Sequence, residues 1–117
     1  MILVDSSVWV DHFRRPDQRL VRLLEAGEVL THSLVIGELA CGNLASRRTT
    51  LELLHALPKA DEASTLEVLT FIERARLHGT GLGVVDVHLL ASMLLSDTEL
   101  WTRDQGLAKA AARLRSM

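Results

Sequence analysis

The sequence predicts an α/β domain in which a parallel sheet carries helices on both faces. Three observations lead to this prediction. Ile2–Val4 is a continuous apolar run, as in a strand buried on both faces of a parallel sheet. Segments with the spacing of strands and of amphipathic helices then alternate along the chain. Finally, Asp104 repeats the position of Asp5, because each acid ends a predicted strand and opens a predicted helix.

Length and composition indicate one domain over residues 1–117, since 117 residues with 48% hydrophobic residues can bury one core but not two. The mean hydropathy of +0.19 suggests apolar surface that a partner covers, with a dense core as the alternative explanation. No apolar run reaches the roughly 18 residues of a membrane span, and no basic signal-peptide region is present, so we expect a cytoplasmic protein without a membrane segment. Cys41, the single cysteine, is expected to be a small buried residue.

Apolar spacing and helix-end residues divide the first half of the chain into elements. Ser6 and Ser7 are helix N-cap candidates after the first strand, and Pro16 ends that helix. Gly27 fits the position after the second helix, and Ser33 is the N-cap candidate of the third. The expected elements are a strand at Ile2–Val4, a helix after it, a helix at Asp17–Ala26, a strand at Glu28–His32, and helices at Ser33–Gly42 and Arg47–Leu57.

The second half of the chain continues the alternation. Ser64 and Glu67 have the spacing of a capping box, which opens a helix. The apolar stripe of that helix is expected at Leu66, Leu69, Ile72 and Ala75. The expected elements are a weak edge strand at Lys59–Ala63, a helix from Ser64 to His78, a helix that begins at about Val84, a strand at Glu99–Thr102, and a last helix at Gln105–Leu114.

Four acids are expected to share one edge of the sheet. Asp5 and Asp104 follow strands whose carboxyl ends meet in one crevice if the two strands are neighbours. Asp86 lies in the first turn of a helix, and Glu38 interrupts an otherwise apolar helical turn. Structural alternatives exist for three of them: a helix cap for Asp5, the helix dipole for Asp86, and an exposed helix face for Glu38.

Carboxylates gathered in one pocket repel each other. At about 5 Å and an effective dielectric of about 20, each pair costs about 3 kcal/mol, so a proton or a divalent cation must relieve the repulsion. Oxygen ligands without Cys or His favour Mg²⁺ or Mn²⁺ over zinc. Such an ion can orient and deprotonate a water and stabilise charge on a phosphate, which makes phosphodiester hydrolysis the expected chemistry.

Four segments of the chain together resemble the PIN-domain ribonucleases, and specifically the VapC-type toxins of bacterial toxin–antitoxin pairs. The segments are MILVDSSVWVDH, VIGELACG, GLGVVDVHLLAS and ELWTRD. The resemblance implies a three-layer α/β/α domain with a central parallel sheet of four to five strands. It also implies an endoribonuclease that depends on Mg²⁺ or Mn²⁺. The fifth strand of the family is expected to be very short or absent, because few residues follow the last predicted helix.

The resemblance also implies roles for individual residues. The family's acidic quartet is matched by position at Asp5, Glu38, Asp86 and Asp104. Asp5 and Asp86 are the expected direct metal ligands, and Ser7 and Thr102 fall where the family places hydroxyls that line the site. The family further implies a homodimer, an RNA substrate and a small VapB-like antitoxin. This antitoxin would present a basic side chain to the acids and fill an apolar groove made by the first, second and fourth helices.

Contacts to RNA are expected from basic side chains. Arg103, beside Asp104, is the preferred candidate for a phosphate contact. The other basic candidates, for which a solvated helix face is the alternative, are Arg14, Arg15, Arg47 and Arg48. Two other protein classes compete with the nuclease. A receiver-type phosphoacceptor domain would have paired acids after its first strand, where serines follow Asp5 here, and a PIN-fold binding module without nuclease activity would have lost acids that this chain retains.

Overall fold

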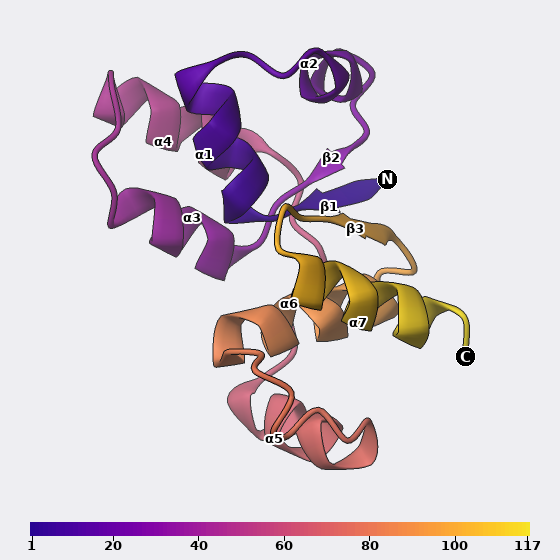
Figure 1. The fold of residues 1–117 in the computed structure, drawn as a ribbon. Helices are drawn as coiled ribbons and strands as arrows, with labels where there is room; N and C mark the ends of the chain where they lie inside the picture. The colour runs from indigo at the N-terminus through magenta and orange to yellow at the C-terminus, as the bar shows by residue number, and fades with distance from the viewer.

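The computed structural model describes residues 1–117 and has three parallel strands between two groups of helices. The strands are β1 (Ile2–Val4), β2 (Val29–Leu30) and β3 (Glu99–Trp101). The helices are α1 (Ser6–Arg14), α2 (Gln18–Glu25), α3 (Ser33–Ala40), α4 (Arg47–Ala56), α5 (Thr65–Arg74), α6 (Val84–Leu95) and α7 (Gln105–Arg115). Figure 1 shows α1 and α2 above the strands, α3 and α4 to their left, and α5 to α7 below them. This arrangement confirms the predicted three-layer α/β/α fold class.

The sheet contains three strands, in the order β2-β1-β3, so the predicted count of four to five was wrong. The predicted edge strand at Lys59–Ala63 forms only one isolated parallel bridge, between Thr31 and Lys59. The chain leaves the sheet directly afterwards, because the Asp61 N–H donates to Ser96 Oγ at 2.8 Å instead of to a strand. No strand follows α7.

The pairing of β1 with β3 brings the two ends of the sequence together. Leu3 and Val4 of the central strand are fully buried, and Val4 is in register with Trp101. The Asp5 N–H then donates to the Trp101 carbonyl at 2.9 Å. Asp5 and Thr102, the residues that follow these strand ends, therefore lie next to each other, which confirms that the first and last strands are neighbours.

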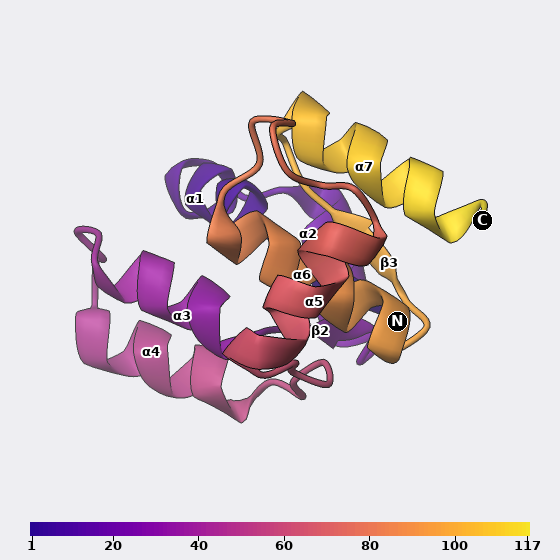
Figure 2. The same cartoon turned by 90° about the horizontal axis from the view of Figure 1, so that it is seen from below.

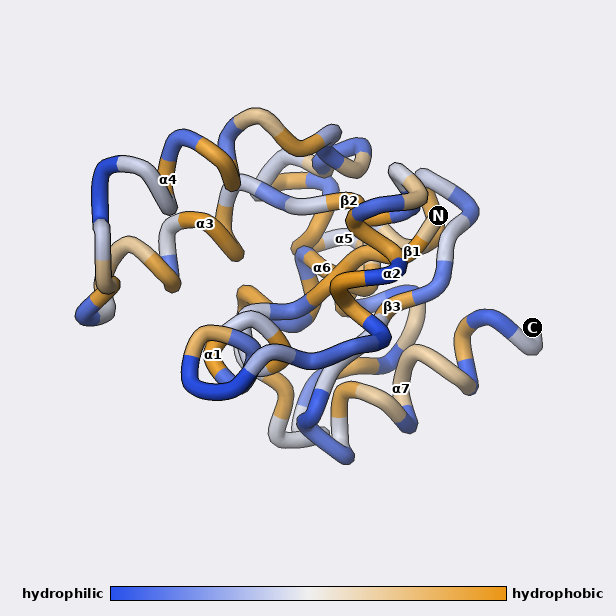
Figure 3. The backbone as a smooth tube through the Cα atoms, turned by 90° about the horizontal axis from the view of Figure 1, so that it is seen from above, coloured by the Kyte–Doolittle hydropathy of each residue, from blue (hydrophilic) through white to orange (hydrophobic).

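The core fixes the helices that carry the other acids. Six residues of α6 are buried, including Leu89, Leu90 and Met93. Helix α7 adds Leu107 and Leu114 to the same core. Figure 3 shows hydrophobic stretches around β1 and α6, and a hydrophilic stretch in the loop between α1 and α2. With 12 residues α6 is the longest helix, and no helix combines the length and apolar character that crossing a membrane requires.

Helix α5 differs from its prediction in both length and orientation. It ends at Arg74 rather than His78, because Arg76 adopts a left-handed φ of 54°. Its buried face is centred on Val68, which is fully buried, with Phe71, Ile72 and Ala75 partly buried. Leu66 and Leu69, which were expected in the core, are 77% and 54% exposed. The helix is therefore rotated relative to the predicted apolar stripe.

Two smaller expectations were also wrong. The N-cap of α1 is Asp5 and that of α3 is His32, one residue before the serines that the sequence suggested. The side chain of His32 takes over the capping role, because its Nδ1 accepts a hydrogen bond from the Leu34 N–H at 2.9 Å. Cys41 is exposed rather than buried, since it follows the last turn of α3 at the surface.

Candidate active site

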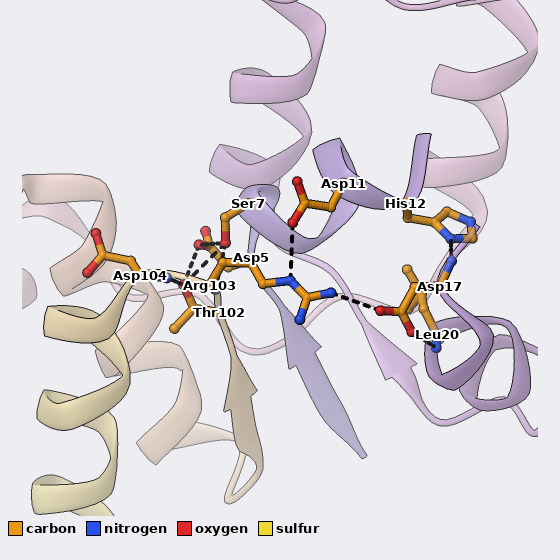
Figure 4. Close-up of polar contacts among 9 residues, drawn as sticks. All are labelled: Asp5, Ser7, Asp11, His12, Asp17, Leu20, Thr102, Arg103 and Asp104. Carbon is orange, nitrogen blue, oxygen red and sulfur yellow. Dashed lines mark hydrogen bonds and ion pairs between the residues drawn. The ribbon is translucent and has the colours of Figure 1, made fainter. Parts of the chain in front are cut away.

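Asp5 is held at the end of β1 by two hydroxyl groups. It occupies the N-cap position of α1, yet its side chain makes no capping hydrogen bond. Instead, Asp5 Oδ2 accepts hydrogen bonds from Ser7 Oγ at 2.8 Å and from Thr102 Oγ1 at 2.7 Å (Figure 4). The residue is only 6% exposed. Helix capping therefore does not explain this acid, and the two predicted hydroxyls both bind it.

The same two hydroxyls join the start of α1 to the end of β3. Ser7 Oγ accepts a hydrogen bond from the Arg103 N–H at 2.9 Å, and Thr102 Oγ1 accepts one from the Asp104 N–H at 3.1 Å. Each hydroxyl thus uses its proton on Asp5 and its lone pair on the backbone of the opposite segment. The position of Asp5 relative to Asp104 is fixed by this small network.

Glu38 approaches the same edge from α3. Its side chain is exposed, and its Oε1 accepts a hydrogen bond from Ser6 Oγ at 3.0 Å. Ser6 Oγ also lies 3.5 Å from Asp5 Oδ1, a long contact. Ser6 therefore lies between two predicted site acids. Sequence reasoning treated it only as a helix-cap candidate, although its place directly after Asp5 was a signal that it belongs to the site.

Asp86 and Asp104 each hold the start of a helix. Asp86 Oδ2 accepts a hydrogen bond from the Gly83 N–H at 3.1 Å in the first turn of α6. Asp104 Oδ1 caps α7 by accepting from the Leu107 N–H at 3.0 Å. For these two acids the structural role leaves room for a role in the site, because each hydrogen bond uses only one carboxylate oxygen.

The charges of three acids act on each other. Burial raises the pKa of the Asp86 carboxyl above its ordinary value. The hydrogen bond from the Gly83 N–H lowers this pKa, while the negative charges of Asp5 and Asp104 raise it further. Asp86 therefore lies within electrostatic reach of both strand-end acids.

The donor set suits a hard divalent cation that keeps part of its water shell. No three Asp, Glu, His or Cys side chains converge closely enough to hold a metal ion by themselves. However, Asp86, Asp104 and Glu38 each have one carboxylate oxygen without a hydrogen bond, and Asp5 Oδ1 has only its long contact. Mg²⁺ usually binds one or two carboxylates and retains several waters, so these free oxygens fit such an ion without an all-protein cage.

Arg103 points away from the acids in this structure. Its Nη2 lies 2.8 Å from Asp17 Oδ2, and its Nε lies 3.3 Å from Asp11 Oδ2. Figure 4 shows the side chain directed toward α1 and α2, while the Asp104 carboxylate points the other way. The pKa of Asp17 is lowered, first by a hydrogen bond from the Leu20 N–H and also by Arg103. An RNA contact by Arg103 stays a prediction, and it would require the guanidinium to exchange an ion-pair partner.

An apolar groove lies beside the acids, between α1, α2 and α4 as predicted. One part of it, about 340 Å³, is lined by Trp9, Leu24 and Leu53 among others. A second part, about 460 Å³, lies between α1, α3 and α4 and includes Glu38. Phe13 and Thr50 line both parts, so the two hollows adjoin, and the second one reaches Glu38, a predicted site acid.

Comparisons with known proteins agree with this geometry. The PIN domain family model matches residues 2–113. The chain is 48% identical over 113 residues to Ribonuclease VapC32 of Mycobacterium tuberculosis, in strains CDC 1551 / Oshkosh and H37Rv, which covers 96% of this chain and 91% of the relative. The crystal structure of FitAcB from Neisseria gonorrhoeae shares the fold, with a TM-score of 0.66 at 23% identity over 96% of this chain and 94% of that chain. The chain therefore belongs to the PIN-domain family as a VapC-type toxin endoribonuclease of a type II toxin–antitoxin system, in a family that generally depends on divalent metal ions and whose VapC toxins pair with VapB antitoxins.

Proposed function

We propose that Asp5, Glu38, Asp86 and Asp104 form the catalytic centre at which this toxin hydrolyses RNA with Mg²⁺ or Mn²⁺. The observation that carries the proposal is the placement of Asp5, whose carboxylate is bound by the Ser7 and Thr102 hydroxyls beside the backbone of Asp104. The pKa of Asp86, raised by burial and also by the charges of Asp5 and Asp104, supports this placement. Negative charges gathered in this way repel one another, and a bound cation relieves that repulsion. The absence of Cys and His among these four residues favours Mg²⁺ or Mn²⁺ as that cation.

The residues of the centre have separate roles in this proposal. Asp5 and Asp86 bind the ion through their free oxygens, while Ser7 and Thr102 fix the orientation of Asp5. Glu38 and Asp104 complete the negative edge. A divalent ion bound there would lower the pKa of a nearby water and offset the negative charge of a phosphate. Burial of Asp5 excludes bulk water from its carboxylate, which strengthens its attraction for a cation.

The variant Asp5→Asn tests this function. Its amide oxygen still accepts the Ser7 and Thr102 hydrogen bonds, so we expect a folded protein by circular dichroism that no longer cleaves RNA in Mg²⁺ or Mn²⁺. Asp97→Asn is the matched control. Asp97 is exposed just before β3, far from its carboxyl end, and its left-handed φ of 48° suits asparagine. Chelation of the metal should abolish cleavage by the wild type and by this control.

Two outcomes would contradict the assignment. Retained metal-dependent cleavage by Asp5→Asn would show that RNA is not hydrolysed at the proposed centre. No cleavage by the wild type with either ion would favour the alternative of a PIN-fold binding module without nuclease activity. Total cellular RNA is the appropriate first substrate, because sequencing the new 5′ ends identifies the cleaved species.

We also propose the two protein partners that the family implies. A VapB-like antitoxin would lie in the groove between α1, α2 and α4 and reach Glu38 with a basic side chain. The adjoining hollow, which shares Phe13 and Thr50 with that groove and includes Glu38, supports this placement. A second copy of the chain would cover Leu66 and Leu69 of α5, whose exposure leaves apolar surface in contact with water.

A further inference from the structure

A basic cleft lies on the α7 side of the site and takes no part in the centre described above. It has a volume of about 320 Å³ and lies between the loop from α5 to α6 and one face of α7. Figure 2 shows this loop reaching the N-terminal end of α7. Its polar and basic lining residues are Arg76, Thr80, Lys109 and Arg113. No acidic residue lines the cleft.

The three cations of the cleft are available for a ligand. None of Arg76, Lys109 and Arg113 forms an ion pair, and all three are exposed. Arg113 uses one N–H on the Ala75 carbonyl at 3.3 Å, which leaves most of its five donors free. By contrast, Arg103 is paired with two acids, as described above. The cleft therefore concentrates positive charge on a protein whose formal net charge is −2.

The arrangement of α7 gives the cleft a direction. Gly106, Lys109, Ala110 and Arg113 share one helical face, while Leu107 and Leu114 face the core. The two basic residues are about 6 Å apart along the helix axis, and two small residues leave room beside them. A row of cations along an open helix face suits a backbone of successive phosphates better than a single small anion.

One end of the cleft lies next to two of the predicted site acids, Asp104 and Asp86. Asp104 caps the helix whose face forms the cleft, and a Cβ added to Gly106 would lie only 3.3 Å from Asp104 Oδ1. On the other wall, Leu82 lines the cleft in the loop that leads into Asp86. A ligand in the cleft therefore extends from the negative edge of the sheet along α7.

We propose that this cleft binds the phosphates of single-stranded RNA next to the bond that is cleaved. The inference rests on the proposed function, because it uses the four acids as the position of the reacting phosphate. Cations that follow the acids along α7 hold the neighbouring phosphates, and Lys109 and Arg113 are positioning residues rather than catalytic ones. An acidic protein segment is less suited, because the groove for a protein partner opens on the α1 side, at Glu38.

The test measures RNA binding separately from cleavage. In the Asp5→Asn background, a short labelled single-stranded RNA is titrated at several salt concentrations. Combined Arg76→Gln, Lys109→Gln and Arg113→Gln should raise Kd about tenfold or more and reduce the slope of log K against log salt by about 2. In the wild-type background, the same changes should raise KM and leave kcat nearly unchanged.

Controls separate charge from folding. Lys109→Gln removes no hydrogen bond, so it tests the cleft even if the triple variant is unstable, and Lys109→Arg should retain binding. Arg22→Gln removes an exposed and unpaired charge of α2 and should leave Kd unchanged. An unchanged Kd and salt slope in the triple variant, with cleavage by the wild type, would overturn the assignment of the cleft.

The failure of the proposed function has a different signature. Suppose that the wild type cleaves no RNA but the three substitutions still weaken RNA binding. The proposed nuclease function is then wrong, while the assignment of the cleft as an RNA-binding site is supported. If the triple variant loses its affinity for the antitoxin and binds RNA normally, the cleft recognises an acidic protein segment, and our inference is wrong.

Discussion

At the scale of single residues, Asp5 and Asp104 have equivalent positions in the sequence and different environments in the fold. The position of each acid after a strand was predictable, because a local change from strand to helix pattern marks it. Their hydrogen bonds were not, since Thr102 reaches Asp5 across 97 residues of sequence. Local pattern therefore identified the candidate acids, while the hydroxyls that orient Asp5 were known only by resemblance and Ser6 was missed.

The raised pKa of Asp86 gives a prediction about pH. A raised folded-state pKa contributes stability below the unfolded value, close to 3.8, and this contribution is lost as the pH rises through the folded pKa. In metal-free buffer near pH 7, Asp86→Asn should therefore raise the free energy of unfolding. The expected gain is only about a few tenths of a kcal/mol, because solvent screens a partly exposed carboxylate.

Urea denaturation near pH 7 and near pH 3 measures this effect. The gain should disappear at the lower pH, where Asp86 is protonated, and Mg²⁺ should stabilise the wild type more than the variant. The amide of the variant can still accept the Gly83 hydrogen bond, so the helix cap is retained. An equal gain at both pH values would show that the ionised carboxylate of Asp86, disfavoured by burial and by the charges of Asp5 and Asp104, is not its cause.

At the scale of elements, apolar spacing located the helices but did not orient all of them. In α5, either Leu66 and Leu69 or Val68 and Ile72 could form the side that faces the core, since both sets have helical spacing. Packing against α6 selects the second set, and no local signal reveals that choice. The bridge at Lys59 has a similar origin, because whether a short extended segment joins a sheet depends on its neighbour in space.

The orientation of α5 leads to a prediction about assembly. Leu66→Glu with Leu69→Glu should convert the proposed homodimer into a monomer, because each substitution places a charge in a surface that would otherwise be desolvated. Sedimentation equilibrium of the wild type and the double variant measures the change. Leu53→Glu, on the exposed side of α4, is the control and should remain dimeric. A wild type that is monomeric at micromolar concentration would contradict the proposed dimer.

At the scale of the whole molecule, the acids lie between two surfaces of opposite character. The apolar groove extends from Glu38 along α1, and the basic cleft extends from Asp104 along α7. The parallel sheet and its acidic edge were predictable, because they depend on the order of elements. The number of strands was not, since strands of two or three residues carry little sequence signal.

This separation of surfaces predicts that inhibition and catalysis can be uncoupled. Leu53 lines the groove and is 66% exposed, so Leu53→Glu should weaken antitoxin binding at least about tenfold without reducing RNA cleavage by the free toxin. Titration of the antitoxin into a cleavage reaction measures both properties. Arg22→Gln on α2, which does not line the groove, should be inhibited like the wild type. Normal inhibition of Leu53→Glu would place the antitoxin elsewhere.

The pairing of β1 with β3 also has a consequence for synthesis of the toxin. Asp5 is translated 97 residues before Thr102, which belongs to the segment that completes its surroundings. A nascent chain therefore lacks Thr102 and Asp104 until residues 99–104 have been translated. We expect RNA cleavage to begin only after that point, which leaves an interval in which the antitoxin can already have been made.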